Sequence, residues 1–220
     1  MAHSIRGKTV TIKDKYQVLI DTIQQFSGEQ HPKLTNKYIK TFQTYLPVDK
    51  YPKILDIGVG EGPQEVEQLR ASGYDVCSIN VQRWRVEDDS KSIVGDMNDQ
   101  RFAPGSFDGA YSTQVMEHGY IPWLGLMETW ITLRPEGRIY FNVPHCNTHE
   151  TVMHPTMFSL SRWKTVLNQI GFKNIMGKET DIWSGELIFE FVAEKQTSEN
   201  KDILTALEKL TEIRINNECI

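Results

Sequence analysis

The sequence predicts an α/β fold in which helices cover a mostly parallel sheet. The first observation is the stretch Ile54-Leu55-Asp56-Ile57, an apolar pair and an acid before Ile57, which is followed by glycines at 58, 60 and 62 and by Pro63. This pattern indicates a buried strand that turns sharply into a helix, because glycine permits the turn and proline suits the first helical turn. The second observation is that further short apolar runs alternate with helix-like segments along the chain.

The composition is that of a globular protein, and the pattern of cysteines leads us to expect a cytoplasmic location. The 220 residues are 39% hydrophobic and 24% charged, which is ordinary for one folded domain with additions. No run approaches the roughly 18 apolar residues that a membrane span needs, and we expect no membrane partner. The first 15 residues lack a secretory signal, and the three cysteines are scattered as in proteins with reduced thiols.

The charges are distributed unevenly along the chain. Residues 1–53 hold nine Lys or Arg against four Asp or Glu, whereas the remainder holds fifteen against twenty-five. The basic segment either favours an anionic substrate or is a solvated helical face. The acidic remainder argues against a nucleic-acid partner, which usually binds a basic stripe.

Helical segments are predicted at both ends of the chain. Residues 1–50 form an N-terminal cap, in which segments 13–26 and 32–46 repeat apolar residues at helical spacing. Their aromatic residues pack in the core or, alternatively, form a substrate lid. Residues 196–220 form a C-terminal helix that either packs on the sheet or contributes, with the other terminal helices, to a homodimer.

The core, residues 51–195, contains the remaining predicted elements. Helices are expected over 64–72, 120–133 and from Ser159 or Ser161 to Ile170, with Gly73 and Gly171 as stop signals. Residues 82–90 form a loop or a short helix. Strands are expected over 54–57, 74–81, 92–94, 107–112, 138–143, 172–177 and 187–193.

Four stretches, in order, resemble class I S-adenosylmethionine (SAM)-dependent methyltransferases. They are Asp56-x-Gly58-x-Gly60-x-Gly62, Gly95-Asp96-Met97, the segment from Ser106-Phe107-Asp108 to Val115-Met116-Glu117-His118, and Leu133-Arg134-Pro135-x-Gly137. The resemblance covers about residues 50–195. It implies a Rossmann-like three-layer sandwich whose seven-stranded, mostly parallel sheet ends in an antiparallel edge hairpin. It also implies SAM as the methyl donor and S-adenosylhomocysteine as the product.

The resemblance implies a cofactor site at the carboxyl ends of the strands. The residues that it assigns to the methionine and ribose part are Asp56, Gly58, Val59, Gly60 and Glu61. Asn80 and Val81 meet the ribose, and Asn80 stands where the family has an acid, which costs about 1 kcal/mol of binding. Asp96 and Met97 face the adenine, although Asp96 also suits a capped turn. Ser112, Thr113 and Gln114 lie beside the methionine amino group and sulfur.

Glu117, His118 and His145 are the candidate catalytic residues. Four of the six histidines fall between positions 118 and 154, and the strand ends that carry His118 and His145 are neighbours in this fold. An imidazole with a pKa near neutrality suits removal of the acceptor's proton.

Two other interpretations of the histidines stay open. Gln114, Glu117 and His118, with His149 or His154, are similar to the divalent-metal site of small-RNA 2′-O-methyltransferases, which have an acid where Gln114 stands. Alternatively, Glu117 and His118 only hold a helix end in place. No metal is assigned among the site residues.

These features predict in-line methyl transfer from SAM to an O, N or C nucleophile of a small or medium organic acceptor. One alternative is a SAM-fold binding or scaffold protein without catalysis, for which Asn80 is the main hint. Another is a metal-assisted enzyme like the RNA 2′-O-methyltransferases. A nicotinamide oxidoreductase is disfavoured, because Pro63 replaces the third glycine of the dinucleotide fingerprint.

Overall fold

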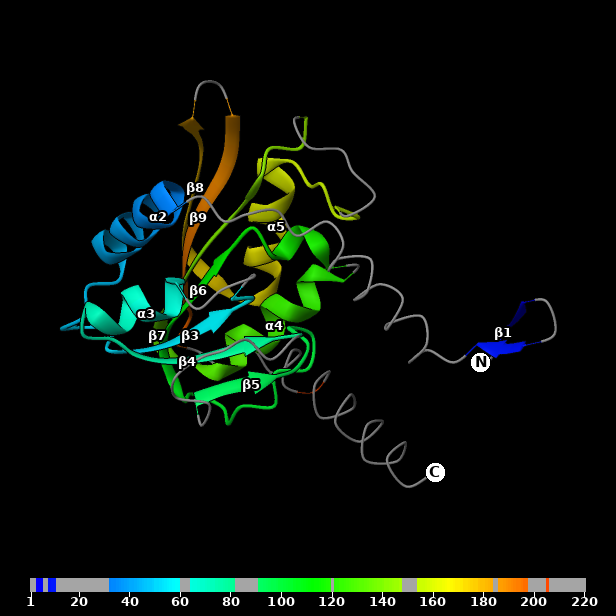
Figure 1. Ribbon diagram of the computed structural model, residues 1–220, viewed down its shortest axis with the longest axis horizontal. Helices are drawn as coiled ribbons and strands as arrows, with labels where there is room; N and C mark the ends of the chain where they lie inside the picture. The colour runs from blue at the N-terminus through cyan, green and yellow to red at the C-terminus, as the bar shows by residue number, and fades with distance from the viewer. Residues whose placement is uncertain are drawn as a thin grey trace.

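The computed structural model describes residues 3–5, 8–10, 32–59, 64–81, 91–119, 121–147, 154–183 and 186–197, and Thr205. Its centre is a seven-stranded sheet in the order β5-β4-β3-β6-β7-β9-β8 (Figure 1). The strands are β3 (Lys53–Ile57), β4 (Asp75–Asn80), β5 (Ser92–Val94), β6 (Phe107–Thr113), β7 (Leu133–Pro144), β8 (Phe172–Trp183) and β9 (Glu186–Lys195). Strand β9 runs antiparallel to both of its neighbours, so the sheet is otherwise parallel. Strands β1 (His3–Ile5) and β2 (Lys8–Val10) form a separate antiparallel pair.

Helices cover both faces of the sheet, which gives three layers (Figure 1). The helices are α2 (Pro32–Tyr45), α3 (Gln64–Ala71), α4 (Pro122–Thr132), α5 (Leu160–Ile170) and the short 3-10 helix η2 (Met116–His118). Successive residues of a strand point to opposite faces. Ile54 therefore joins one buried cluster with residues of α2 and α3, whereas Leu55 and Ile57 join another with residues of α4 and α5.

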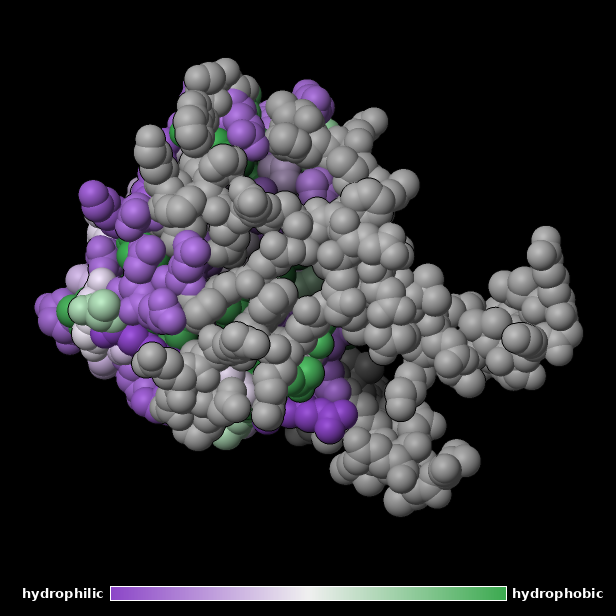
Figure 2. Space-filling view, in the orientation of Figure 1, coloured by the Kyte–Doolittle hydropathy of each residue, from purple (hydrophilic) through white to green (hydrophobic). Residues whose placement is uncertain are grey.

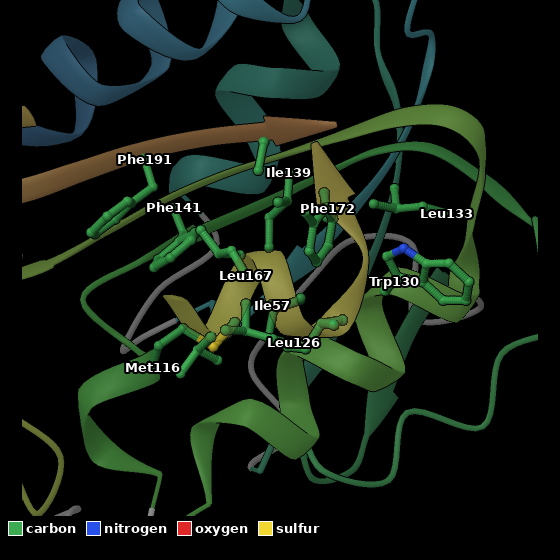
Figure 3. Packing of buried hydrophobic residues seen from close by; sticks show 14 of the residues in the cluster. Ile57, Met116, Leu126, Trp130, Leu133, Ile139, Phe141, Leu167, Phe172 and Phe191 are labelled. Carbon is green, nitrogen blue, oxygen red and sulfur yellow. The ribbon is translucent and has the colours of Figure 1, made fainter. Parts of the chain in front are cut away.

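The cluster that contains Leu55 and Ile57 also includes Met116, the first residue of η2. Met116 is fully buried, and its side chain points toward Ile57 and Leu126 (Figure 3). Burial of a side chain of this size contributes roughly 1.5–3 kcal/mol, so the methionine anchors η2 on the sheet. The two residues that follow, Glu117 and His118, are placed by this anchor.

Helix α2 packs on the sheet by its aromatic side, as predicted. Phe42 is fully buried, with its ring centroid 5.2 Å from that of Tyr111 and 6.0 Å from that of Tyr140. The opposite side of α2 is polar and exposed, and hydrophilic side chains gather over this helix in Figure 2. On that side, the Lys37 ammonium group donates to the backbone carbonyl of Asp181 at 2.9 Å.

The predicted Rossmann-like fold with its antiparallel edge is confirmed, and two strands differ from their predicted ranges by more than two residues at one end. Strand β7 begins at Leu133 instead of residue 138, because Leu133 pairs with Phe107 while Arg138 pairs with Gly109. The four residues between them form a bulge in which Glu136 has a left-handed φ of 62°. Strand β8 continues to Trp183, six residues beyond its predicted end.

Several predicted segments lie outside the described residues: the first helix over 13–26, the segment 82–90 and, apart from Thr205, the C-terminal segment 198–220. None of the helices within the described ranges has the length and apolar character that a membrane crossing requires.

Candidate active site

The carboxyl ends of β3, β4 and β5 meet at one edge of the sheet. The Gly58 N–H donates to the Ile79 carbonyl at 2.9 Å, which joins the turn after β3 to the end of β4. The Gly95 N–H donates to the Asn80 carbonyl at 2.9 Å, which joins the end of β4 to the turn after β5. Ligands of open α/β sheets bind at this edge. The structure therefore brings three of the predicted cofactor segments together.

The first glycine turn is closed by a residue that follows β6. Gly58 has a left-handed φ of 80°, a conformation that glycine adopts without strain. A Cβ atom at this position would collide with Val115, whose Cγ1 would be 2.7 Å away. The neighbouring Val59 is buried in the core, so its side chain faces away from this edge. The other residues predicted for this turn, Gly60 and Glu61, lie outside the described residues.

Asp56 is a buried acid directly before this turn. Its side chain is fully buried, and within the described ranges neither carboxylate oxygen has a hydrogen-bond partner. Burial raises the pKa of Asp56 well above its usual value, the nearby Glu65 raises it further, and Arg70 opposes the shift. A buried polar group without a partner is costly, so a bound ligand that donates hydrogen bonds here would be stabilised.

Glu65 is a second buried acid, which the sequence analysis missed. The Thr113 hydroxyl lies 3.1 Å from each of its carboxylate oxygens and donates to this carboxylate. Burial raises the pKa of Glu65 to about 7, although the Thr113 hydrogen bond lowers it. Acids are common in the first turn of a helix, so nothing local separates Glu65 from the exposed Glu67. Its burial depends on Thr113, which is distant in the sequence.

The predicted ribose and adenine residues lie at the ends of β4 and β5. The Asn80 Oδ1 accepts from the Val81 N–H at 3.0 Å. The Asp96 Oδ1 accepts from the Asn98 N–H at 2.8 Å, so the capped turn considered as an alternative is present. This turn uses one carboxylate oxygen and is compatible with a ligand contact to the other. The Met97 side chain is partly buried and lies close to Gly119 and Gly125.

The end of β6 holds the three remaining cofactor candidates. The Ser112 hydroxyl donates to the Ile57 carbonyl at 3.2 Å, so it links β6 to β3. Gln114 has a left-handed φ of 53°, a strained conformation of the kind that gathers at functional sites. Its side-chain amide donates to the Asn142 Oδ1 at 2.8 Å, which fixes the strand end next to β7.

Glu117, His118 and His154 form a cluster after this strand end. The His118 Nε2 lies 4.0 Å from the Glu117 Oε1, and the His118 and His154 rings are 4.9 Å apart by centroids. The Glu117 side chain is only 1% exposed, and burial raises its pKa to about 8. The sequence predicts that His118 lies beside the loop after β7, and in the structure His154 of this loop contacts His118.

His145 occupies a different environment. Its ring packs on Phe189 of β9 at 4.6 Å between centroids, and its Nε2 lies 3.8 Å from the Glu179 Oε1 of β8. The structure therefore groups His145 with the edge hairpin and His154 with His118. His149, the other histidine considered for a metal, lies outside the described residues. The sequence predicted that these strand ends meet but did not separate the histidines.

Comparison with known families identifies a methyltransferase domain. Residues 55–141 match the family model described as "Methyltransferase domain". The O-methyltransferase rstn1 of Aspergillus nomiae is 30% identical over 146 residues, a match that covers 56% of this chain and 65% of the relative. The match thus spans just under two thirds of the length of that curated relative.

Solved structures share the fold at low sequence identity. The 1,6-didemethyltoxoflavin-N1-methyltransferase of Burkholderia thailandensis has a TM-score of 0.66 and 12% identity, and the match covers 89% of this chain and 99% of that one. It was solved with 1,6-didemethyltoxoflavin and S-adenosylhomocysteine. The cyclase SpnF has a TM-score of 0.63 and 12% identity, with 83% and 93% covered. These likenesses establish the fold, which supports more than one chemistry.

Proposed function

We propose that the chain is a class I SAM-dependent methyltransferase, which transfers a methyl group from SAM to a small or medium organic acceptor. The name of the fungal relative favours an oxygen acceptor over nitrogen or carbon. The Burkholderia neighbour acts on a small molecule, and the acidic charge of this chain disfavours a nucleic acid. A homodimer through the terminal helices stays a prediction.

The observation that carries this proposal is the edge where Asp56, the Gly58 turn, Asn80 and Asp96 meet; Asp56 has no hydrogen-bond partner among the described residues. The buried oxygens of Asp56 suit the hydroxyl and ammonium donors of SAM. The left-handed φ of Gly58 allows the sharp turn by which the chain leaves β3 at this edge. The residues present therefore fit SAM.

We assign the parts of SAM to residues along this edge. Asn80 and Val81 meet the ribose, and Asp96 with Met97 meets the adenine. Thr113, with Ser112 and Gln114, lies beside the methionine amino group, where the carboxylate of Glu65 would offset the positive charge. By family resemblance, Gly60 and Glu61 complete the turn after Gly58.

The acceptor is proposed to bind beside Glu117 and His118, at the end of the strand that carries Thr113. SAM supplies a methyl group on a sulfonium sulfur, which leaves in line with the attacking atom. His118 is partly exposed and takes part in removing the acceptor's proton, and the buried Glu117 lies beside it, with Oε1 4.0 Å from the His118 Nε2. His145, on the side of the edge hairpin, orients the acceptor.

Tritiated SAM with an acceptor panel tests the proposal. The panel contains phenols, aliphatic alcohols, amines, carboxylic acids and total RNA. We expect label transfer to at least one hydroxyl compound and none to RNA. Transfer to RNA alone would favour the RNA 2′-O-methyltransferase alternative. Tight SAM binding without transfer to any member would favour a binding protein without catalysis.

A further inference from the structure

The cluster of Glu117, His118 and His154 contains the donor atoms of a metal site. One carboxylate oxygen and one nitrogen from each imidazole all lie within 4.8 Å of one another. It is the one group of this kind in the part of the chain that the structure describes. Two imidazoles and a carboxylate are a common ligand set for divalent transition metals, and three protein ligands leave positions open for other molecules.

The state of Glu117 points independently to a ligand. Its side chain is 1% exposed, and neither carboxylate oxygen has a hydrogen-bond partner among the described residues. A buried acid without donors is costly to the fold. The His118 Nε2 lies 4.0 Å from the Glu117 Oε1, which is beyond hydrogen-bond distance. A cation between them would compensate this carboxylate.

The cluster is held in place from two sides. Met116 anchors η2 in the core (Figure 3), which positions the next two residues. The Thr156 N–H donates to the Glu117 carbonyl at 3.2 Å, and the Thr156 hydroxyl donates to the Gly119 carbonyl at 2.6 Å. These two bonds tie the segment that carries His154 to η2. The proximity of His154 and His118 is therefore built into the fold.

We propose that Glu117, His118 and His154 bind one divalent transition-metal cation. Metal–ligand distances of about 2.0–2.2 Å place ligand atoms roughly 3 to 3.5 Å apart. The present 4.0 Å between His118 and Glu117 closes to that range by a small rotation of His118, whose side chain is 31% exposed. The nitrogen and oxygen donors suit Mn²⁺, Fe²⁺, Co²⁺ or Zn²⁺ better than Mg²⁺ or Ca²⁺, which prefer oxygen alone.

A metal at this site would favour a hydroxyl compound as the methyl acceptor, an inference that rests on the proposed function. An acceptor hydroxyl that occupies an open position has a lowered pKa, and its proton passes to solvent. The oxygen then forms a bond to the methyl carbon, the carbon–sulfur bond breaks, and its electron pair stays on sulfur. With the metal bound, His118 is a ligand and acts on the proton through the cation.

Cobalt titration of chelator-treated full-length protein tests the site. Co²⁺ bound to nitrogen and oxygen ligands absorbs visible light, so binding is followed without an activity assay. We expect one cation per chain. His154→Ala and Glu117→Gln should each weaken binding by more than the about 10- to 100-fold that loss of an outer partner costs. His145→Ala, which removes a histidine outside the cluster, should bind Co²⁺ like the wild type.

Two results would overturn the metal site. One is the absence of Co²⁺ binding by folded wild-type protein at millimolar concentration. The other is equal Co²⁺ binding by the wild type, His154→Ala and Glu117→Gln, which would place the metal elsewhere. Calorimetry with SAM on the same metal-free samples separates this inference from the proposed function. SAM binding without Co²⁺ binding overturns only the metal site, whereas Co²⁺ binding without SAM binding overturns the proposed function.

Discussion

The hydroxyl of Thr113 lies 3.1 Å from both carboxylate oxygens of Glu65, so a residue at the end of β6 holds a buried acid of α3. The pKa of this acid is raised from 4.5 to about 7, chiefly by burial. The folded protein keeps the proton over a pH range in which the unfolded chain releases it. The free energy of unfolding should therefore fall as the pH rises from about 4.5 to about 7.

Glu65→Gln should remove this contribution while keeping an oxygen that accepts from Thr113. We expect the variant to be more stable than the wild type above pH 7, by up to about 3 kcal/mol. Below pH 4.5 the two should be alike. Urea unfolding at several pH values measures the difference. Glu67→Gln, on the exposed side of the same helix, is the control, and an equal effect there would contradict the assignment to Glu65.

Gly58 offers a test of the turn. Gly58→Ala should lower the free energy of unfolding by about 1–3 kcal/mol and weaken SAM binding, because of both the left-handed φ and the collision with Val115. The double variant with Val115→Ala should regain the stability that Gly58→Ala loses through the collision. It should still lack the stability that is lost through the left-handed φ. Unfolding and SAM titration of the three variants measure this. An unaffected single variant would contradict the turn's role.

Substitution of Asp96 tests whether this residue only caps a turn or also binds the adenine of SAM. Asp96→Asn keeps an oxygen for the Asn98 N–H, so the thermal stability should stay close to wild type. The new amide group is a donor, and it cannot accept from the amino group of adenine. SAM affinity should fall about 10-fold or more, which corresponds to the loss of a charged acceptor. Asp75→Asn, at the other end of β4, should bind SAM normally. Equal affinities for all three proteins would rule out the adenine role.

Asn80 tests the ribose assignment at the end of β4. Asn80→Asp restores the charged acceptor of the related enzymes, so SAM binding should be unchanged or tighter by about 1 kcal/mol. Calorimetry with SAM measures the change. Loss of SAM binding in a folded variant would show that β4 does not correspond to the ribose-binding strand of the methyltransferases.

Substitution of His118 tests whether this residue has a catalytic or a structural role. His118→Asn should reduce turnover about 10²- to 10⁴-fold while SAM affinity stays nearly constant, because the cluster lies beside the acceptor. Turnover is measured with the acceptor that the tritium panel identifies. A variant that melts at a lower temperature but keeps its turnover would assign His118 a structural role only.

The sequence predicted most of the sheet because its strands have strong local signals. The strand over 92–94 was predicted with its observed ends, and glycine stop signals marked the ends of α3 and α5. The start of β7 was wrong by five residues, since it depends on the pairing of Leu133 with Phe107 across the sheet. Long-range pairing of this kind leaves no local pattern.

Site residues that belong to a sequence motif could be predicted. Site residues that only the fold brings together could not. Asp56, Gly58, Asn80 and Asp96 were named from the sequence and lie at one edge. Glu65 was missed because its burial depends on β6. His154 could not be singled out by sequence, since its approach to His118 depends on the hydrogen bond between the Thr156 N–H and the Glu117 carbonyl.

The central claim is that the protein binds SAM at the carboxyl edge of its sheet, and titration calorimetry tests it most directly. We expect one molecule of SAM or of S-adenosylhomocysteine to bind per chain, and each to raise the melting temperature, because both bind the folded state. NADH should produce no heat. Absence of binding by both SAM and S-adenosylhomocysteine, together with clear binding of NADH, would contradict the claim.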